Sequence, residues 1–111
     1  MRRLDKHAFR FLGLPYEKGG RGETLDCIGL VYLCAEAAGE PLPEDWTRWR
    51  SLVEMVCEPM PGDLGVCTHY GQPHIIIVSA EQKAWSTDQK FGVAQIPLRA
   101  FPDTRYYRFL K

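Results

Sequence analysis

The sequence predicts an α+β fold, in which helices in the first part of the chain precede an antiparallel sheet in the second. Before residue 57, apolar residues recur at the three- and four-residue spacing of helices. After Pro61-Gly62-Asp63 they form short runs rich in β-branched and aromatic residues, separated by turn residues. The 111 residues contain no internal repeat and no linker, so we expect one domain over residues 1–111.

The N-terminal segment predicts a first helix of about ten residues that ends at Gly13. Its apolar stripe consists of Leu4, His7, Ala8, Phe11 and Leu12. A lone histidine on such a stripe is usually a packing or capping residue, so we assign His7 no chemistry. Residues 13–22 follow with four glycines and one proline, a composition that predicts a loop.

A central helix is expected to start at Asp26 and to end at Gly39. Its apolar positions are Cys27, Leu30, Val31, Cys34, Ala35 and Ala38. Asp26 is suited to cap this helix, which would stabilise it by about 1 kcal/mol. Because the apolar stripe is wide, we expect this helix to be the buried one.

Residues 44–56 predict a further helix, capped by Glu44-Asp45 and ended by Pro59 and Pro61. Its apolar positions are Trp46, Trp49, Leu52, Val53 and Val56. Five strands are then expected, over residues 64–68, 74–78, 83–87, 93–96 and 105–109. They predict a roughly five-stranded antiparallel sheet that closes over the central helix.

The charge composition disfavours several classes of partner. Fourteen basic and fourteen acidic residues give a formal net charge of zero without a basic stripe, so we expect no nucleic-acid partner. No stretch approaches the roughly 20 apolar residues of a membrane span. Charged residues interrupt the N-terminus, so we expect no signal peptide and a cytoplasmic protein as synthesised. The motif spacing predicts neither a metal ion nor another cofactor.

The four cysteines lack the spacing of zinc sites and of secreted disulfide scaffolds, so we expect them to be reduced. Cys27 stands where a glycine-rich polar segment becomes an apolar helix. At a helix start, free amides and the positive end of the macrodipole favour the thiolate and lower the thiol pKa. Cys27 is therefore a candidate nucleophile, and the alternative is a small core residue. Cys34, Cys57 and Cys67 are expected to be structural.

A nucleophilic cysteine needs a base, and two histidines in the second half of the chain are candidates. His74 opens the most apolar strand, just after the turn Gly71-Gln72-Pro73, so its side chain is placed to face the start of the central helix. His69 lies in the preceding turn region, where a solvated histidine is usual. We therefore favour His74, and the alternative is a strand-edge histidine that binds a neighbouring carbonyl.

Four motifs, in the same order along the chain, resemble those of the NlpC-type cysteine peptidases. These are papain-like enzymes that cleave peptide bonds in bacterial cell-wall peptidoglycan. The motifs are Gly13-Leu14-Pro15-Tyr16 with Gly19-Gly20, Asp26-Cys27-Ile28-Gly29-Leu30-Val31, Pro61-Gly62-Asp63-Leu64, and His74-Ile75-Ile76-Ile77-Val78. The resemblance covers nearly the entire chain. It implies a minimal papain-like domain whose central helix carries Cys27.

The resemblance also implies a role for each matched residue. Cys27 would be the nucleophile, and His74 the general base that becomes the acid for the leaving amine. Tyr16 would line the cleft with its hydroxyl toward the thiol, and Asp26 would help to hold the free amino group of the wall peptide. Backbone amides around Cys27, together with Tyr16, would meet the oxyanion.

Two positions depart from the family pattern. Ile28 stands where serine usually follows the cysteine, a feature that resembles phage-encoded and tail-associated members. The third catalytic position, most often a histidine on the strand after His74, corresponds here to Ser86. Strand alternation places Ser86 and Asp88 on the same face, so Ser86 is the first candidate and Asp88 the second. The alternative is a backbone carbonyl or a water molecule, because the imidazole needs only one acceptor.

The sequence thus predicts a thiol hydrolase that cleaves an amide bond in peptidoglycan stem peptides. One alternative is a phage tail-assembly component, or another structural or binding module, with weak or lost activity on the same fold. A transferase or deamidase that uses the same thiol chemistry on proteins is another. We expect a phage tail or secretion-machinery partner, and delivery to the virion or the cell wall.

Overall fold

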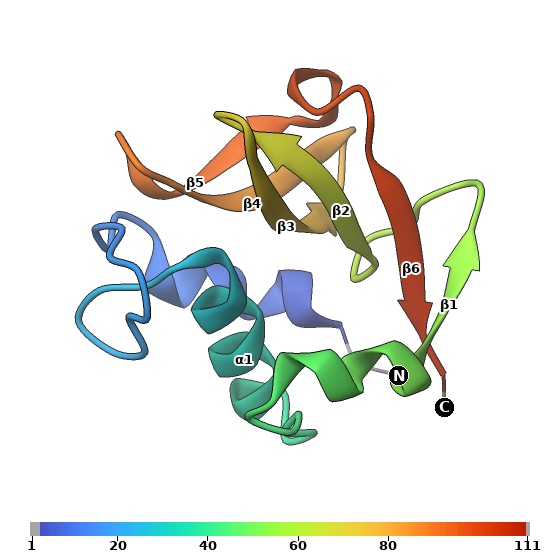
Figure 1. Ribbon diagram of the computed structural model, residues 1–111, viewed down its shortest axis with the longest axis horizontal. Helices are drawn as coiled ribbons and strands as arrows, with labels where there is room; N and C mark the ends of the chain where they lie inside the picture. Colours follow the sequence, from blue (N-terminus) through green and yellow to red (C-terminus); the bar gives the residue numbers. More distant parts are fainter. Residues whose placement is uncertain (1–2, 111) are drawn as a thin grey trace.

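The computed structural model describes residues 3–110, which form a layer of helices against one face of a six-stranded antiparallel sheet (Figure 1). The strand order is β1-β6-β2-β3-β4-β5. Every neighbouring pair of strands is antiparallel. The predicted α+β class is confirmed, and the sheet has one strand more than predicted.

All five predicted strands are present. The sheet consists of β1 (Val53–Val56), β2 (Leu64–His69), β3 (Gln72–Ser79), β4 (Lys83–Asp88), β5 (Gly92–Pro97) and β6 (Arg105–Phe109). Strands β2 to β5 follow one another as a meander, whereas β6 returns to lie between β1 and β2. Tyr70 and Gly71, with φ of +51° and +73°, form the two-residue turn between β2 and β3.

Strand β1 shows that the predicted helix over residues 44–56 is wrong in its second half. A 3-10 helix, η3, spans Trp46–Leu52, and Asp45 caps it by accepting the Thr47 amide at 3.1 Å. The next four residues form β1, which pairs with β6 from Val53↔Phe109 to Val56↔Tyr106. The apolar spacing of this segment fits a helix, but the partner strand lies at the far end of the chain and decides the conformation.

The predicted first helix is present as two 3-10 segments, η1 (Leu4–Lys6) and η2 (Ala8–Phe11). Leu4 and Ala8 are fully buried, so both of these predicted apolar positions lie in the core although the helix is interrupted at His7. His7 joins the two segments, and its amide donates to the Leu4 carbonyl at 3.0 Å. His7 is therefore a capping residue through its backbone.

Helix α1 (Cys27–Ala37) is the central helix predicted from the sequence (Figure 1). Asp26 is its N-cap, and its carboxylate accepts the Gly29 amide at 2.6 Å. The helix ends before Gly39, whose φ of +79° is accessible to glycine at little cost. Neither α1, with 11 residues, nor any other helix within residues 3–110 is long and apolar enough to cross a membrane.

Two apolar clusters lie on opposite faces of the sheet, as strand alternation requires. Ile77 belongs to the cluster that contains the buried face of α1, whereas Ile76 and Val78 belong to a second cluster with Phe101. A short 3-10 segment, η4 (Leu98–Ala100), precedes Phe101 and helps to cover this second face. The sheet is therefore buried on both faces near the middle of β3.

Candidate active site

A cleft of about 260 Å³ lies between the start of α1 and the neighbouring ends of β2, β3 and β4. Four of the predicted site residues line it, namely Tyr16, Asp26, Cys27 and His74. Lys18, His69, Tyr70 and Thr87 also contribute to its wall. The fold thus brings the predicted nucleophile and the predicted base to one concave surface.

The loop of residues 13–25 is fixed on both sides, which places Tyr16 in the cleft. On one side it pairs with β5, because the Val93 amide donates to the Leu14 carbonyl at 2.9 Å. A Cβ atom at Gly92 would overlap the same carbonyl oxygen, so this close approach requires glycine. On the other side, the Leu25 amide donates to the Pro15 carbonyl at 3.0 Å.

Cys27 is the first residue of α1, and its side chain is half-buried at the cleft. Burial raises the pKa of the Cys27 thiol above its ordinary value. The amides of Ile75, Ile28 and Cys27 itself hydrogen-bond the sulfur and lower this pKa, while the charge of Asp26 raises it. The net effect is a raised thiol pKa, whereas the sequence predicted a lowered one. Desolvation of the thiolate outweighs its stabilisation by the amides at the start of α1.

His74 is buried, with 8% of its surface exposed, and it hydrogen-bonds Ser86. Its Nε2 atom lies 2.8 Å from the Ser86 Oγ, and Ser86 itself is fully buried. The pKa of His74 is lowered to about 4, mainly by burial and also by the nearby His69, while Asp88 acts in the opposite direction. His74 is therefore a neutral imidazole at neutral pH, with one nitrogen engaged by the first-choice partner from the sequence.

Asp88, the second-choice partner of His74, contacts His69 instead. The Asp88 Oδ2 atom lies 2.9 Å from His69 Nε2 and accepts the Tyr70 hydroxyl at 3.4 Å. Its Oδ1 atom accepts the Lys90 amide at 2.6 Å, so Asp88 is also a turn residue. Hydrogen bonds from His69 and this amide lower the pKa of Asp88, although burial opposes them.

His69 is not the solvated turn histidine that the sequence suggested. It is the last residue of β2, its side chain is 22% exposed, and it lines the cleft. Its ring centroid lies 5.0 Å from that of His74, and both rings pack against Phe101. Sequence reasoning missed this arrangement because His69 and Asp88 are 19 residues apart and meet only through strand register.

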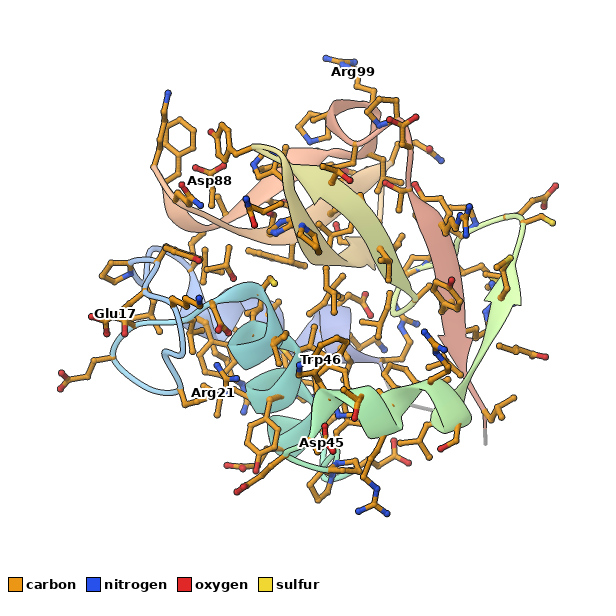
Figure 2. All side chains as sticks on the ribbon, viewed as in Figure 1. Glu17, Arg21, Asp45, Trp46, Asp88 and Arg99 are labelled. Carbon is orange, nitrogen blue, oxygen red and sulfur yellow. The ribbon has the colours of Figure 1, made fainter. Side chains whose placement is uncertain are left out.

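Asp26 lines the cleft, but its carboxylate is already engaged within the protein. Oδ1 accepts the Gly29 amide at 2.6 Å and pairs with Arg21 Nη1 at 2.7 Å. Oδ2 accepts the Gly19 amide at 2.9 Å. Figure 2 shows Arg21 in the loop beside α1. Asp26 is thus the N-cap that the sequence offered as the structural alternative, and it also anchors the glycine-rich loop.

The remaining cysteines differ in exposure. Cys34 and Cys67 are buried, as expected, and burial raises the pKa of their thiols to about 12 and about 11 respectively. Cys57 is exposed and therefore does not belong to the core. It follows β1 directly, one residue beyond the helix predicted over residues 44–56.

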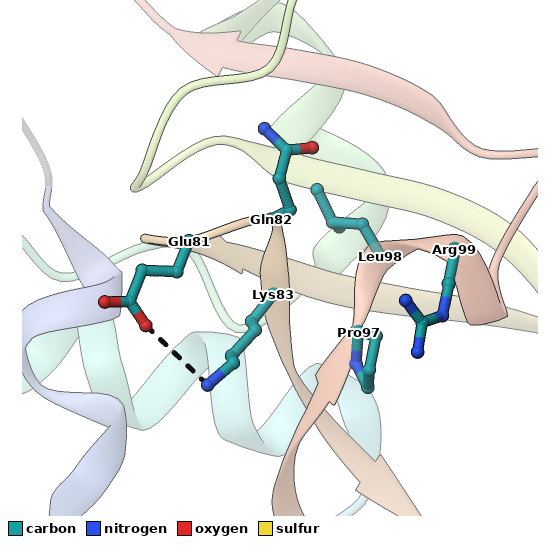
Figure 3. A pocket seen from close by; sticks show the side chains of 6 residues that line it. All are labelled: Glu81, Gln82, Lys83, Pro97, Leu98 and Arg99. Carbon is teal, nitrogen blue, oxygen red and sulfur yellow. Dashed lines mark ion pairs between the residues drawn. The ribbon is translucent and has the colours of Figure 1, made fainter.

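A second hollow, of about 320 Å³, lies at the opposite end of β4 (Figure 3). The residues drawn there are Glu81, Gln82, Lys83, Pro97, Leu98 and Arg99. The Glu81 and Lys83 side chains form an ion pair at 3.7 Å, and they are 80% and 44% exposed. This hollow is slightly larger than the cleft, but its lining includes neither a cysteine nor a histidine. The cleft at Cys27 is therefore the candidate active site.

A half-buried cysteine at the start of the central helix, in one cleft with a histidine of an antiparallel sheet, is the arrangement of the papain-like class. No protein-family model and no curated protein matches the chain. Solved structures do match it. An NlpC/P60 family protein from Bacillus cereus has a TM-score of 0.80 and 23% identity, over 98% of this chain and 40% of that chain.

Two further structures are peptidoglycan hydrolases. The NlpC/P60 domain of SagA has a TM-score of 0.76 and 18% identity, over 97% of each chain. RipB from Mycobacterium tuberculosis has a TM-score of 0.77 and 19% identity, over 98% of this chain and 64% of that chain. The chain thus spans less than half of the Bacillus cereus protein but almost all of the SagA domain. It has the fold of these NlpC/P60 structures.

Proposed function

We propose that this chain is a cysteine peptidase that hydrolyses an amide bond in peptidoglycan stem peptides, with Cys27 as nucleophile and His74 as base. The observation that carries the proposal is a single cleft lined by Cys27, at the start of α1, and by His74, in contact with Ser86. The choice of substrate is supported by the fold, because SagA and RipB are peptidoglycan hydrolases.

In the proposed reaction, the Cys27 sulfur attacks the carbonyl carbon of the substrate while His74 takes the thiol proton. The carbonyl oxygen becomes an oxyanion, which backbone amides around Cys27 and the Tyr16 hydroxyl stabilise. His74 then gives its proton to the leaving amine, and a thioester remains on Cys27. Water, deprotonated by His74, hydrolyses the thioester, releases a carboxylic acid and restores the thiol.

Ser86 is proposed as the residue that orients the His74 ring. Its hydroxyl is fully buried and lies 2.8 Å from Nε2, so this nitrogen has a fixed partner. The other ring nitrogen, Nδ1, is then the one that receives the thiol proton. A hydroxyl is a weaker acceptor than a carboxylate, so Ser86 fixes the ring's direction more than it stabilises its charge.

Ile28, the residue that follows the proposed nucleophile, is the basis for a proposal about how the protein reaches the cell wall. Its side chain is partly buried and packs against the main apolar cluster, so the departure from serine is accommodated by packing. On the resemblance to phage-encoded members, we propose that a phage tail or a secretion machinery delivers the protein to the wall. Co-purification of the chain with virions or with a secretion complex tests this point.

The function is tested by incubating the protein with purified muropeptides and measuring the masses of the products. The proposal predicts products that gain one water at an amide bond and that are absent with Cys27→Ala. A structural or binding module predicts no product with either protein. Cys57→Ser serves as the control, because it removes an exposed thiol outside the cleft and should leave the products unchanged.

A further inference from the structure

The ring of His74, the proposed base, is fixed by an uncharged group. Ser86 Oγ lies 2.8 Å from the Nε2 atom of this ring, and a hydroxyl carries no charge. His74 is buried, so the imidazolium that forms when it takes a proton is removed from water. A buried charge is costly unless an opposite charge lies near it. The base therefore needs a counter-charge from elsewhere in the protein.

Asp88 is a buried carboxylate with which no lysine or arginine forms an ion pair within residues 3–110. Among the ion pairs of these residues, Asp5 and Asp63 also have side chains that are at most 8% exposed, and both pair with an arginine. Asp88 pairs with His69 instead, at 2.9 Å. Burial raises the pKa of Asp88, but hydrogen bonds from His69 and from backbone amides outweigh this effect, so the carboxylate is ionised at neutral pH.

His69 contacts both Asp88 and His74. Its Nε2 atom lies 2.9 Å from Asp88 Oδ2, and its ring centroid lies 5.0 Å from that of His74, with 35° between the ring planes. An ionised carboxylate can only accept, so His69 Nε2 carries the hydrogen of this bond. A neutral His69 therefore leaves the pair with one negative charge beside His74, whereas a protonated His69 leaves the pair with no net charge.

Other titratable groups surround this pair. The Tyr70 hydroxyl donates to Asp88 at 3.4 Å, and the Tyr70 ring lies 4.2 Å from that of His69. Further titratable side chains line the cleft, namely Tyr16, Lys18, Asp26 and Cys27. Burial is the main cause of the low pKa of His74, and after it His69 lowers this pKa while Asp88 raises it. Both signs agree with the geometry of the pair.

We propose that Asp88, held by His69, is the counter-charge for the imidazolium that His74 forms during the reaction. Ser86 directs the ring, and the His69–Asp88 pair offsets its charge. The proton passes from the Cys27 thiol to His74 and later to the leaving amine, while His69 and Asp88 exchange no proton. Both act through His74 and are positioning residues. The assignment rests on the proposed function, because it concerns the base of the same site.

Asp88→Asn tests the assignment, because it removes the charge and keeps an oxygen for the amides of the β4–β5 turn. We expect kcat for muropeptide hydrolysis to fall by about ten-fold, the factor equivalent to one pKa unit, with little change in KM. The pKa of His74, followed by NMR titration, should fall below about 4. Asp103→Asn is the matched control, since it makes the same change of charge at an exposed residue and should alter neither readout.

His69→Gln is the complementary variant. The glutamine amide can donate to Asp88 but takes no proton, so the negative charge stays in place. The pKa of His74 should therefore rise above about 4, and kcat should fall less than in Asp88→Asn. A purely structural role of the pair would change the free energy of unfolding, measured by urea denaturation, without moving the His74 titration in opposite directions in the two variants.

An unchanged kcat in Asp88→Asn, a change in KM alone, or shifts of the His74 pKa in the same direction in both variants would overturn the inference. Failure of the proposed function has a different signature, namely the absence of Cys27-dependent hydrolysis of any muropeptide. The titration needs no substrate, so it would still decide whether Asp88 is the counter-charge of His74.

Discussion

Cys27 and His74 are both driven toward their neutral forms by burial. Desolvation raises the pKa of the thiol and lowers that of the imidazole to about 4. Around neutral pH the protein therefore holds a thiol beside an imidazole, rather than a preformed thiolate and imidazolium. In the proposed mechanism, the proton moves during attack on the substrate, when the developing charge on the carbonyl oxygen gains its own hydrogen bonds.

This protonation state can be read from alkylation rates. In a Cys57→Ser protein, which lacks the exposed thiol, the rate of iodoacetamide reaction at Cys27 should keep rising with pH through the ordinary thiol range. A raised pKa leaves little thiolate at neutral pH, so the reaction there should be slow. The adducts are mapped by mass spectrometry. A rate that reaches a plateau below about pH 7 would show a preformed thiolate instead.

The two histidines of the cleft should differ in their effect on catalysis. His74→Ala removes the proposed base and should lower the hydrolytic rate by about 10²- to 10⁴-fold. His69→Ala should have a smaller effect, because the ring nitrogen of His69 is engaged by Asp88. Initial rates of the two variants, with circular dichroism to confirm folding, decide between them. Equal losses would mean that the base is misassigned.

Ser86→Ala should lower the hydrolytic rate and shift the titration of His74. The change leaves the buried Nε2 atom without its partner, so the ring loses its fixed direction at a cost in stability of about 1 to 3 kcal/mol. Rate measurements and an NMR titration of the imidazole provide the two readouts. If Ser86→Ala altered stability but neither readout, Ser86 would be a packing residue only.

At the scale of elements, Asp88 connects the two hairpin turns beside the cleft. One of its oxygens contacts His69 and Tyr70 at the β2–β3 turn, and the other accepts the amides of Lys90 and Phe91 at the β4–β5 turn. Because the carboxylate is buried and its partners belong to different hairpins, it fixes their relative position.

Asp88→Ala should therefore destabilise the protein by about 1 to 3 kcal/mol, since buried donors lose their acceptor. The free energy of unfolding is measured by urea denaturation. Lys83→Ala, at the other end of the same strand and in an exposed ion pair, is the control and should change it little. A similar loss in both variants would contradict the assignment of Asp88 as the connection between the turns.

Much of this architecture could be predicted because its signals are local. The five strands of the second half follow from alternating runs between turn residues, and α1 from its cap and apolar spacing. The contact between His74 and Ser86 follows the spacing of the family pattern. By contrast, β1 depends on β6, and His69 depends on Asp88, so only strand pairing far along the chain reveals them. The raised pKa of Cys27 depends on burial, which the sequence around the helix start does not show.

At the scale of the whole molecule, the chain shares its fold with solved structures to which its sequence identity is low. The matched NlpC/P60 structures share 18–23% of their residues with this chain and superpose with TM-scores of 0.76 to 0.80. In this chain the fold brings the start of α1 close to β3, where the Ile75 amide hydrogen-bonds the Cys27 sulfur. The proposed chemistry depends on a few side chains at this point of the fold rather than on most of the surface.

The central claim, that Cys27 is the nucleophile of an amide hydrolase, is tested most directly by one comparison of rates. The initial rate of amide cleavage in a wall muropeptide is measured for the protein and for Cys27→Ala under identical conditions. The proposed mechanism predicts a loss of at least about a thousand-fold, as removal of a nucleophile causes in other hydrolases. Cleavage by Cys27→Ala within about ten-fold of the parent rate would contradict it.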